Sequence, residues 1–176
     1  MPENLSQRFP DLARELGPKN VAMLMRATTE LEVPAGRAII RDRMPVDSLY
    51  MLMQGEVEIS VEENRRAISL GVVGPGQWLG EVSVLSGEML ASSTVTAVTN
   101  VTLLRIKHQA FEELVMGSDE VAAPLLRQLT AMLTERLRAT AQVAAQPINI
   151  RKVEAREVQI EEGKSKGWLQ SFFGRS

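Results

Sequence analysis

The sequence of 176 residues predicts a mainly β domain with flanking helices. Between Thr28 and Lys107, short apolar runs alternate with turn residues, a pattern typical of many short strands. The segments on either side have their apolar residues at helical spacing instead. About eight short strands in about 80 residues favour a β-roll of the jelly-roll type, a double-stranded β-helix.

Residues 1–27 form the expected N-terminal helical segment. Leucine, valine and methionine recur at helical spacing between Pro10 and Arg26. The pair Gly17-Pro18 divides this stretch into two short helices.

Residues 28–107 form the expected β-roll. Valine and isoleucine alternate with glutamate and serine over Glu56–Glu62. This period of two places one face of a strand inward and the other outward. The stretches 67–73 and 94–106 are rich in β-branched residues and suit strands.

Residues 108–146 form the expected C-terminal helices. A short helix ends at Gly117-Ser118, and a long helix then runs from Asp119 to about Ala145, roughly 35–40 Å at about 1.5 Å per residue. The apolar stripe of the long helix needs a partner, which is either the roll or the twin helix of a dimer. The stripe comprises Leu126, Leu129, Leu133 and Leu137.

Residues 147–176 form the expected tail, with a net charge of +2 against −4 for the residues before it. Most of the tail is charged and lacks aromatic residues, as in a flexible linker. The end of the tail differs, because Trp168, Leu169, Phe172 and Phe173 stand there among three cationic residues. We expect these four residues to dock in a groove of a partner protein. A weak contact with a membrane surface and packing on the chain's own roll are the alternatives.

The composition excludes several classes of function. The chain has no cysteine and one histidine, which excludes thiolate chemistry, clusters of histidine ligands and a Ser-His-Asp triad. No paired set of carboxylates stands out, so we expect neither an enzyme nor a metal site. The net charge of −2 argues against a nucleic-acid-binding surface over the whole protein. No apolar run reaches the length of a transmembrane helix, and the N-terminus lacks the apolar core of a signal peptide.

The most informative stretch is Leu70–Ala97, which reads LGVVGPGQWLGEVSVLSGEMLASSTVTA. Gly76 and Gly80 allow a positive φ and a close approach of the backbone. Glu81 falls where a short helix begins after a strand, and the backbone N–H groups at such a helix start can hold an anion. A roll with a short helix inserted in this way is a pocket for a phosphate group.

These residues, together with other motifs in the same order, resemble the cyclic-nucleotide-binding domain, as in the cAMP receptor protein family. The resemblance covers about residues 12–143 and includes the turn at Gly36, LYMLMQGEVEI at Leu49–Ile59, the segment GPGQWLGE and the two helices at the end. It implies a phosphate-binding loop over residues 76–95, called the cassette below, with a short helix near Gly80–Leu85. It also implies that the long helix covers the pocket and forms the seam of a homodimer. The resemblance further implies a bacterial, cytoplasmic protein.

The resemblance carries the family's ligand contacts over to single residues. Gly80 and Glu81 match the start of the family's cassette, where the glutamate accepts a hydrogen bond from the ribose 2′-hydroxyl. Ser92 and Ser93 match small residues that touch the phosphate, and Thr140 falls about where some members contact the purine. The residues that would line a ligand such as cAMP or cGMP are Gly80, Glu81, Val82, Ser92, Ser93 and Thr140.

Ala91 departs from the family pattern, because it stands where the family has an arginine that pairs with the phosphate. A charge-assisted pair is about twice as strong as a neutral hydrogen bond. Its loss removes about 1.5–3 kcal/mol, which is roughly tenfold to hundredfold in affinity. No Lys or Arg lies between Ala67 and Leu104 to replace it.

We therefore expect a non-enzymatic regulatory or scaffolding module with a degenerate pocket. The alternative is a genuine cAMP or cGMP receptor, in which backbone amides, Ser92, Ser93 and a distant arginine such as Arg65, Arg66 or Arg105 hold the anion. Transcription factors of this family carry a winged helix-turn-helix after the long helix. Residues 147–176 lack that pattern, so we expect no DNA binding.

Overall fold

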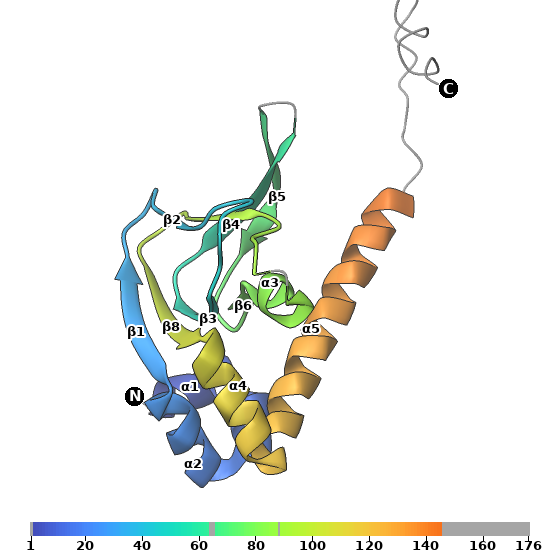
Figure 1. Ribbon diagram of the computed structural model, residues 1–176. Helices are drawn as coiled ribbons and strands as arrows, with labels where there is room; N and C mark the ends of the chain where they lie inside the picture. Colours follow the sequence, from blue (N-terminus) through green and yellow to red (C-terminus); the bar gives the residue numbers. More distant parts are fainter. Residues whose placement is uncertain (1, 64–65, 88, 146–176) are drawn as a thin grey trace, which may run out of the picture. The chain divides into compact units, whose positions relative to one another are not determined.

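A computed structural model describes residues 2–63, 66–87 and 89–145 of the chain. Five helices and eight strands follow one another in these ranges (Figure 1). The helices are α1 (Pro2–Arg8), α2 (Pro10–Arg26), α3 (Glu81–Ser86), α4 (His108–Gly117) and α5 (Asp119–Ala145). The strands are β1 (Thr28–Val33), β2 (Ala38–Ile40), β3 (Ser48–Gln54), β4 (Val57–Glu63), β5 (Arg66–Val73), β6 (Trp78–Leu79), β7 (Thr94–Ala97) and β8 (Val101–Lys107).

Two antiparallel four-stranded sheets build the roll. One sheet has the strand order β1-β8-β3-β6, and the other has the order β2-β7-β4-β5. This arrangement confirms the predicted mainly β fold with flanking helices. The stretch 94–106, which suited a strand, is two strands, because the backbone N–H groups of Val98 and Thr99 donate to the carbonyl oxygen of Glu56 and turn the chain between β7 and β8.

Strand β3 shows why the roll has two apolar cores. Leu49, Met51 and Met53 face the helices, whereas Leu52 faces the interior of the roll, and all four side chains are buried. Successive side chains of a strand point to opposite faces, so the continuous apolar run in this strand serves both cores. One core lies inside the roll, and the other lies between the sheet β1-β8-β3-β6 and the helices.

The N-terminal helices anchor the first part of the cassette. Leu5 of α1 and Phe9, which joins α1 to α2, are fully buried, and the ring of Phe9 meets the indole of Trp78 edge-on at 5.8 Å between centroids. Helix α2 is interrupted at Gly17, as predicted, where φ is 70° and ψ is 167°. Only glycine adopts this backbone conformation readily.

The C-terminal helices have nearly the predicted bounds. Helix α5 begins at Asp119, and Pro124 lies inside it. Val121, Leu125 and Leu129 are fully buried in the core between the helices and the sheet, so α5 packs on its own chain over these turns. None of the helices in the described ranges has the length and apolar character that crossing a membrane requires.

The chain divides into two compact units, Met1–Ala139 and Thr140–Ser176. The described part of the second unit is the last six residues of α5. The domain boundary predicted after residue 146 therefore stays a prediction.

Candidate functional site

Helix α3 starts at a backbone position that requires glycine. Gly80 has a φ of 80°, and a Cβ atom added to it would lie 2.9 Å from the carbonyl oxygen of Ser48. Both the dihedral angle and the space therefore exclude a larger residue. The next residue, Glu81, is thereby held at the first position of α3, where its side chain is buried.

Glu81 forms an ion pair with Arg136 of α5, the contact that joins the cassette to the long helix. The Nη1 group of Arg136 donates a hydrogen bond to Oε1 of Glu81. Its Nη2 group donates to the carbonyl oxygen of Trp78 at 2.8 Å and to Oε1 of Gln77 at 3.4 Å. One guanidinium from α5 thus contacts two residues that precede α3, Gln77 and Trp78, and the first residue of α3, Glu81.

The buried position of Glu81 affects its ionisation. Burial raises the pKa of the Glu81 carboxyl above its ordinary value of 4.5. The charge of Arg136 and hydrogen bonds from the Glu81 backbone N–H and from Arg136 lower the same pKa, but burial outweighs them. The carboxylate is therefore a group that is costly to leave without a cation.

Ala91 lies in the apolar interior of the roll, with 5% of its surface exposed. Its backbone N–H donates to the carbonyl oxygen of Met44 at 2.9 Å, and its own carbonyl oxygen accepts from the N–H of Arg43 at 2.8 Å. This segment of the cassette is thus held by backbone bonds to the turn before β3. The position implied for a phosphate-binding arginine is occupied by a buried methyl group.

The grouping of the other predicted ligand residues around a nucleotide stays a prediction. Val82 and Ser92 are exposed, and Ser93 is half-buried. Thr140 lies in α5, but its side chain is outside the described part of the structure. The tail residues Trp168, Leu169, Phe172 and Phe173 also lie outside the described residues.

Arg136 is the site residue that the sequence analysis missed. The cations considered there were Arg65, Arg66 and Arg105. Arg105 is half-buried and lies opposite Tyr50 in the β3–β8 pairing. A signal for Arg136 was present, because it stands four residues before Thr140, and residues at that spacing share one face of a helix.

The predicted leucine stripe on α5 is split between two environments. Leu129 is fully buried in its own chain, which is a correction, because it does not line a surface on which a second helix could pack. Leu126 is 39% exposed and Leu133 is half-buried, whereas the side chain of Leu137 is outside the described part. The homodimer itself stays a prediction. Over the described ranges, no three histidine or acidic side chains are placed to hold a metal ion.

Comparison with known proteins agrees with this architecture. A cyclic nucleotide-gated potassium channel of Mesorhizobium japonicum, mll3241, is 34% identical over 111 residues, which are 63% of this chain and 29% of the channel. Glutaminase 2 of Bradyrhizobium diazoefficiens is 31% identical over 126 residues, which are 72% of this chain and 19% of that protein. The matched region spans less than a third of either relative, and the activities in their names belong to those proteins.

A solved structure shares the fold. The cyclic nucleotide-binding domain from Methylobacillus flagellatus has a TM-score of 0.70 to this chain at 19% identity, covering 79% of this chain and 83% of that one. The family model described as "Cyclic nucleotide-binding domain" matches residues 30–118, which is half of the chain. This match, on a jelly-roll with a glycine–glutamate start to α3, shows that the chain belongs to the cyclic nucleotide-binding domain family.

Proposed function

We propose that this chain is a non-enzymatic regulatory module whose cassette is closed by its own long helix. The observation that carries the proposal is the ion pair between Glu81 and Arg136. By resemblance, Glu81 is the carboxylate that would bind the ribose of a nucleotide. Because the side chain of Glu81 is buried as well as paired with Arg136, a nucleotide can reach this carboxylate only when that contact opens.

The cassette is a poor fit for a cyclic phosphate as a routine ligand. A phosphodiester carries a full negative charge, and moving it beside the buried side chain of Ala91 removes it from water without supplying a cation. The neighbouring Glu81 carboxylate has the same sign of charge. Both features disfavour cAMP and cGMP and support a module that acts through protein partners.

A second candidate function rests on Arg136 itself. Its side chain is 30% exposed, so an incoming phosphate can reach the guanidinium that now contacts Glu81. In this alternative the chain is a receptor for cAMP or cGMP, and the phosphate replaces Glu81 as the ion-pair partner of Arg136.

Isothermal titration calorimetry with cAMP and cGMP separates the two functions. The closed module predicts no binding of either nucleotide by the wild-type chain at micromolar concentration. Micromolar binding by the wild-type chain that weakens in both Glu81→Ala and Arg136→Gln would contradict the closed module and establish the receptor.

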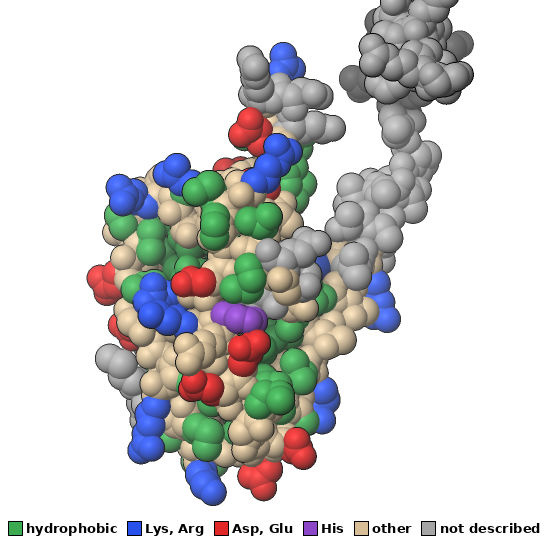
Figure 2. Space-filling view, in the orientation of Figure 1, with side chains coloured by type: hydrophobic (Ala, Val, Ile, Leu, Met, Phe, Trp, Pro, Cys, Tyr) green, Lys and Arg blue, Asp and Glu red, His purple; other side chains and the backbone are tan. Residues whose placement is uncertain are grey.

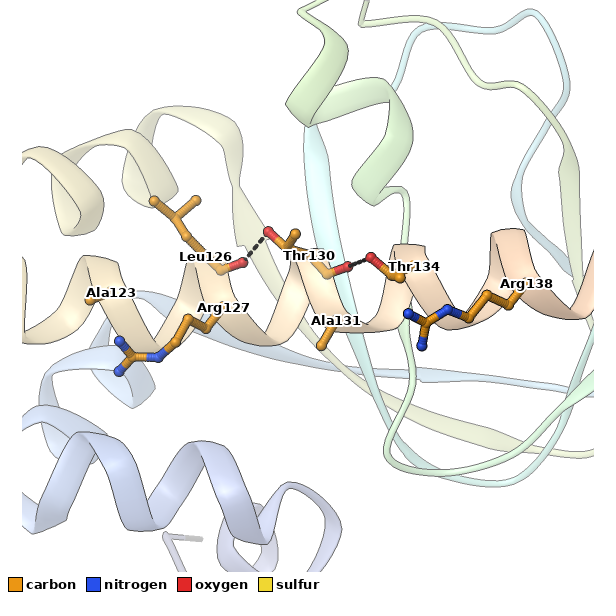
Figure 3. Close-up of a pocket in the computed structure, with 7 residues that line it drawn as sticks. All are labelled: Ala123, Leu126, Arg127, Thr130, Ala131, Thr134 and Arg138. Carbon is orange, nitrogen blue, oxygen red and sulfur yellow. Dashed lines mark hydrogen bonds between the residues drawn. The ribbon is translucent and has the colours of Figure 1, made fainter.

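We also propose that the chain forms a homodimer through the exposed face of α5. Figure 3 shows the residues of this face in the single chain. The face is an open groove of about 630 Å³, lined by Ala123, Leu126, Arg127, Thr130, Ala131, Thr134 and Arg138. The hydroxyls of Thr130 and Thr134 donate to the carbonyl oxygens of Leu126 and Thr130 at 2.6 and 2.8 Å. Both hydroxyl groups therefore have hydrogen-bond partners within the helix itself. Between Arg127 and Arg138, the short side chains of Thr130, Ala131 and Thr134 beside the exposed Leu126 allow a second helix to approach.

The tail supplies the proposed contact with a partner protein, in the cytoplasm as the resemblance implies. The test compares the full chain with a chain that ends at Gly163 and with the variant Trp168→Ala/Phe172→Ala in pull-downs. We expect a partner that the full chain retains and both altered chains lose. Capture of the same proteins by all three would end the tail proposal and leave the cassette proposal untouched.

A further inference from the structure

The two sheets have four edge strands, and three of them are protected against pairing with another strand. The edge strand β1 carries Glu30 and Glu32. The edge strand β6 has two residues, both buried, and β2 has three residues. Charged side chains and short length are the common means by which proteins prevent edge-to-edge association.

The fourth edge strand, β5, is neither short nor charged along its length, because its one charged residue, Arg66, stands at its end. It is the longest strand described, with eight residues, and among the described residues it is paired with β4 alone. Ile68, Leu70 and Val72 are 42%, 62% and 55% exposed, and residues 67–73 contain neither a charged residue nor a proline. Figure 2 shows hydrophobic side chains along this part of the β4–β5 hairpin, below charged side chains near its tip. A long, exposed, apolar edge of this kind is a template for another strand.

Leu70 is the centre of this edge. The adjacent β4 residues Ile59 and Ser60 are paired with Gly71 and Ser69, so Leu70 is an extra residue in a β-bulge. A bulge residue has no residue directly opposite it.

We propose that β5 pairs antiparallel with β5 of a second copy of this chain, which joins two four-stranded sheets into one of eight strands. Antiparallel pairing of two identical strands is the arrangement that a two-fold axis produces. It brings the apolar side chains of both strands together around the two Leu70 residues. It also satisfies the outward backbone groups of both edges at once.

The charges favour a second copy over a charged partner strand. Arg66 is the one charged residue of β5, and it stands at the end of the strand. In a ladder centred on Leu70, the two Arg66 residues lie about 26 Å apart, at about 3.3 Å per residue. That distance exceeds the screening length of about 8 Å at physiological salt, so they repel little. A charged strand would meet no opposite charge along residues 67–73, whereas self-pairing of β1 would bring its glutamates together.

The test uses the full chain and two measurements over a range of protein concentrations. Sedimentation velocity reports the mass, and hydrogen exchange reports the protection of the β5 amides. We expect that protection to rise with concentration, in step with the mass. The variant Leu70→Lys places two ammonium groups at the ladder centre, and it should raise the dissociation constant of this interface at least about tenfold. Because Leu70 is largely exposed, the variant should keep its fold.

Two controls make the result specific. Met116→Lys replaces a side chain that is 87% exposed on α4 and should change neither measurement. An equimolar mixture of Leu70→Lys and Leu70→Glu chains should recover the association that each loses alone, because opposite charges then meet at the centre.

The proposal is overturned if Leu70→Lys leaves the mass unchanged or if the β5 amides exchange freely at every concentration. Protection that does not depend on concentration would also overturn it, since β5 would then be covered within one chain. The α5 dimer is tested separately by Leu126→Lys. Loss of that interface should leave the protection of β5 in place, so the two proposals can fail independently.

Discussion

The guanidinium of Arg136 donates a hydrogen bond to the carboxylate of Glu81, a residue 55 positions away in the sequence. The contact joins α5 to the first turn of α3, and the same guanidinium contacts the carbonyl oxygen of Trp78. Breaking one side of a buried ion pair costs about 3–5 kcal/mol, and the partial exposure of Arg136 places this pair at the lower end. A ligand that needs Glu81 has to overcome that cost.

Arg136→Met should destabilise the chain by about 3 kcal/mol, because it leaves the buried Glu81 carboxylate without its cation. Urea unfolding measures the free energy of unfolding. The double variant Arg136→Met/Glu81→Gln should recover part of the loss, since the uncompensated charge is gone. Arg37→Met, on an exposed residue outside the proposed dimer face, is the control and should cost less than about 0.5 kcal/mol. Equal losses for Arg136→Met and the control would show that the pair contributes nothing to stability.

Glu81 should make the free energy of unfolding depend on pH in a definite direction. Its pKa in the folded chain is raised above the ordinary value of 4.5, so the folded state holds the proton more tightly than the unfolded state. The stabilising contribution of protonation is therefore present below pH 4.5 and is lost as pH rises through the raised pKa. Relative to Glu81→Gln, the wild-type chain should gain stability as the pH falls from neutrality towards 4.5. Urea titrations of both chains at several pH values measure this difference, and a constant difference would contradict the prediction.

Substitutions at two leucines of α5, Leu126 and Leu129, should have different effects on association and on stability. Leu126→Lys alters an exposed residue of the proposed dimer face, so it should shift the sedimenting mass of that dimer towards the monomer with little change in stability. Leu129→Ala opens a cavity in the fully buried core and should cost about 2–5 kcal/mol in urea unfolding. The β5 pairing can be blocked by Leu70→Lys in the same chain. If adding Leu126→Lys to that chain left the sedimenting mass unchanged, the proposed dimer through α5 would be contradicted.

The two glycines at the ends of α3 allow a matched test of the cassette geometry. Gly80 and Gly87 have nearly the same left-handed conformation, with φ of 80° and 73°. An added Cβ meets the carbonyl oxygen of Ser48 at 2.9 Å at Gly80 and meets no atom within 4 Å at Gly87. Gly87→Ala should therefore cost about 1 kcal/mol from backbone strain alone. Gly80→Ala should cost about 2–3 kcal/mol, because the steric clash adds to the same strain. Thermal or urea unfolding measures both, and equal losses would contradict the requirement for close packing at Gly80.

The roll was predictable because its signals are local. The alternation of Val57, Ile59 and Val61 with polar residues predicts strand β4, and Val57 is fully buried, whereas Ile59 and Val61 are half-buried. The interruption at Gly17 and the start of α5 at Asp119 were also predicted, because glycine, proline and helix periodicity act within a few residues. The division of the stretch 94–106 into β7 and β8 was not predicted, since its turn depends on a carbonyl oxygen of Glu56, which is remote in sequence.

Residue identities at fixed spacings were enough to predict the class of fold and the start of α3 at Gly80-Glu81. Through the resemblance, they also placed Ala91 where the family has its phosphate-binding arginine. Tertiary structure decided which cation reaches Glu81, which leucines of α5 are left for a partner and which sheet edge is open. Those outcomes depend on how distant segments pack: a side chain's partner is whatever the folded chain brings within a few ångströms of it, and no local pattern encodes that distance.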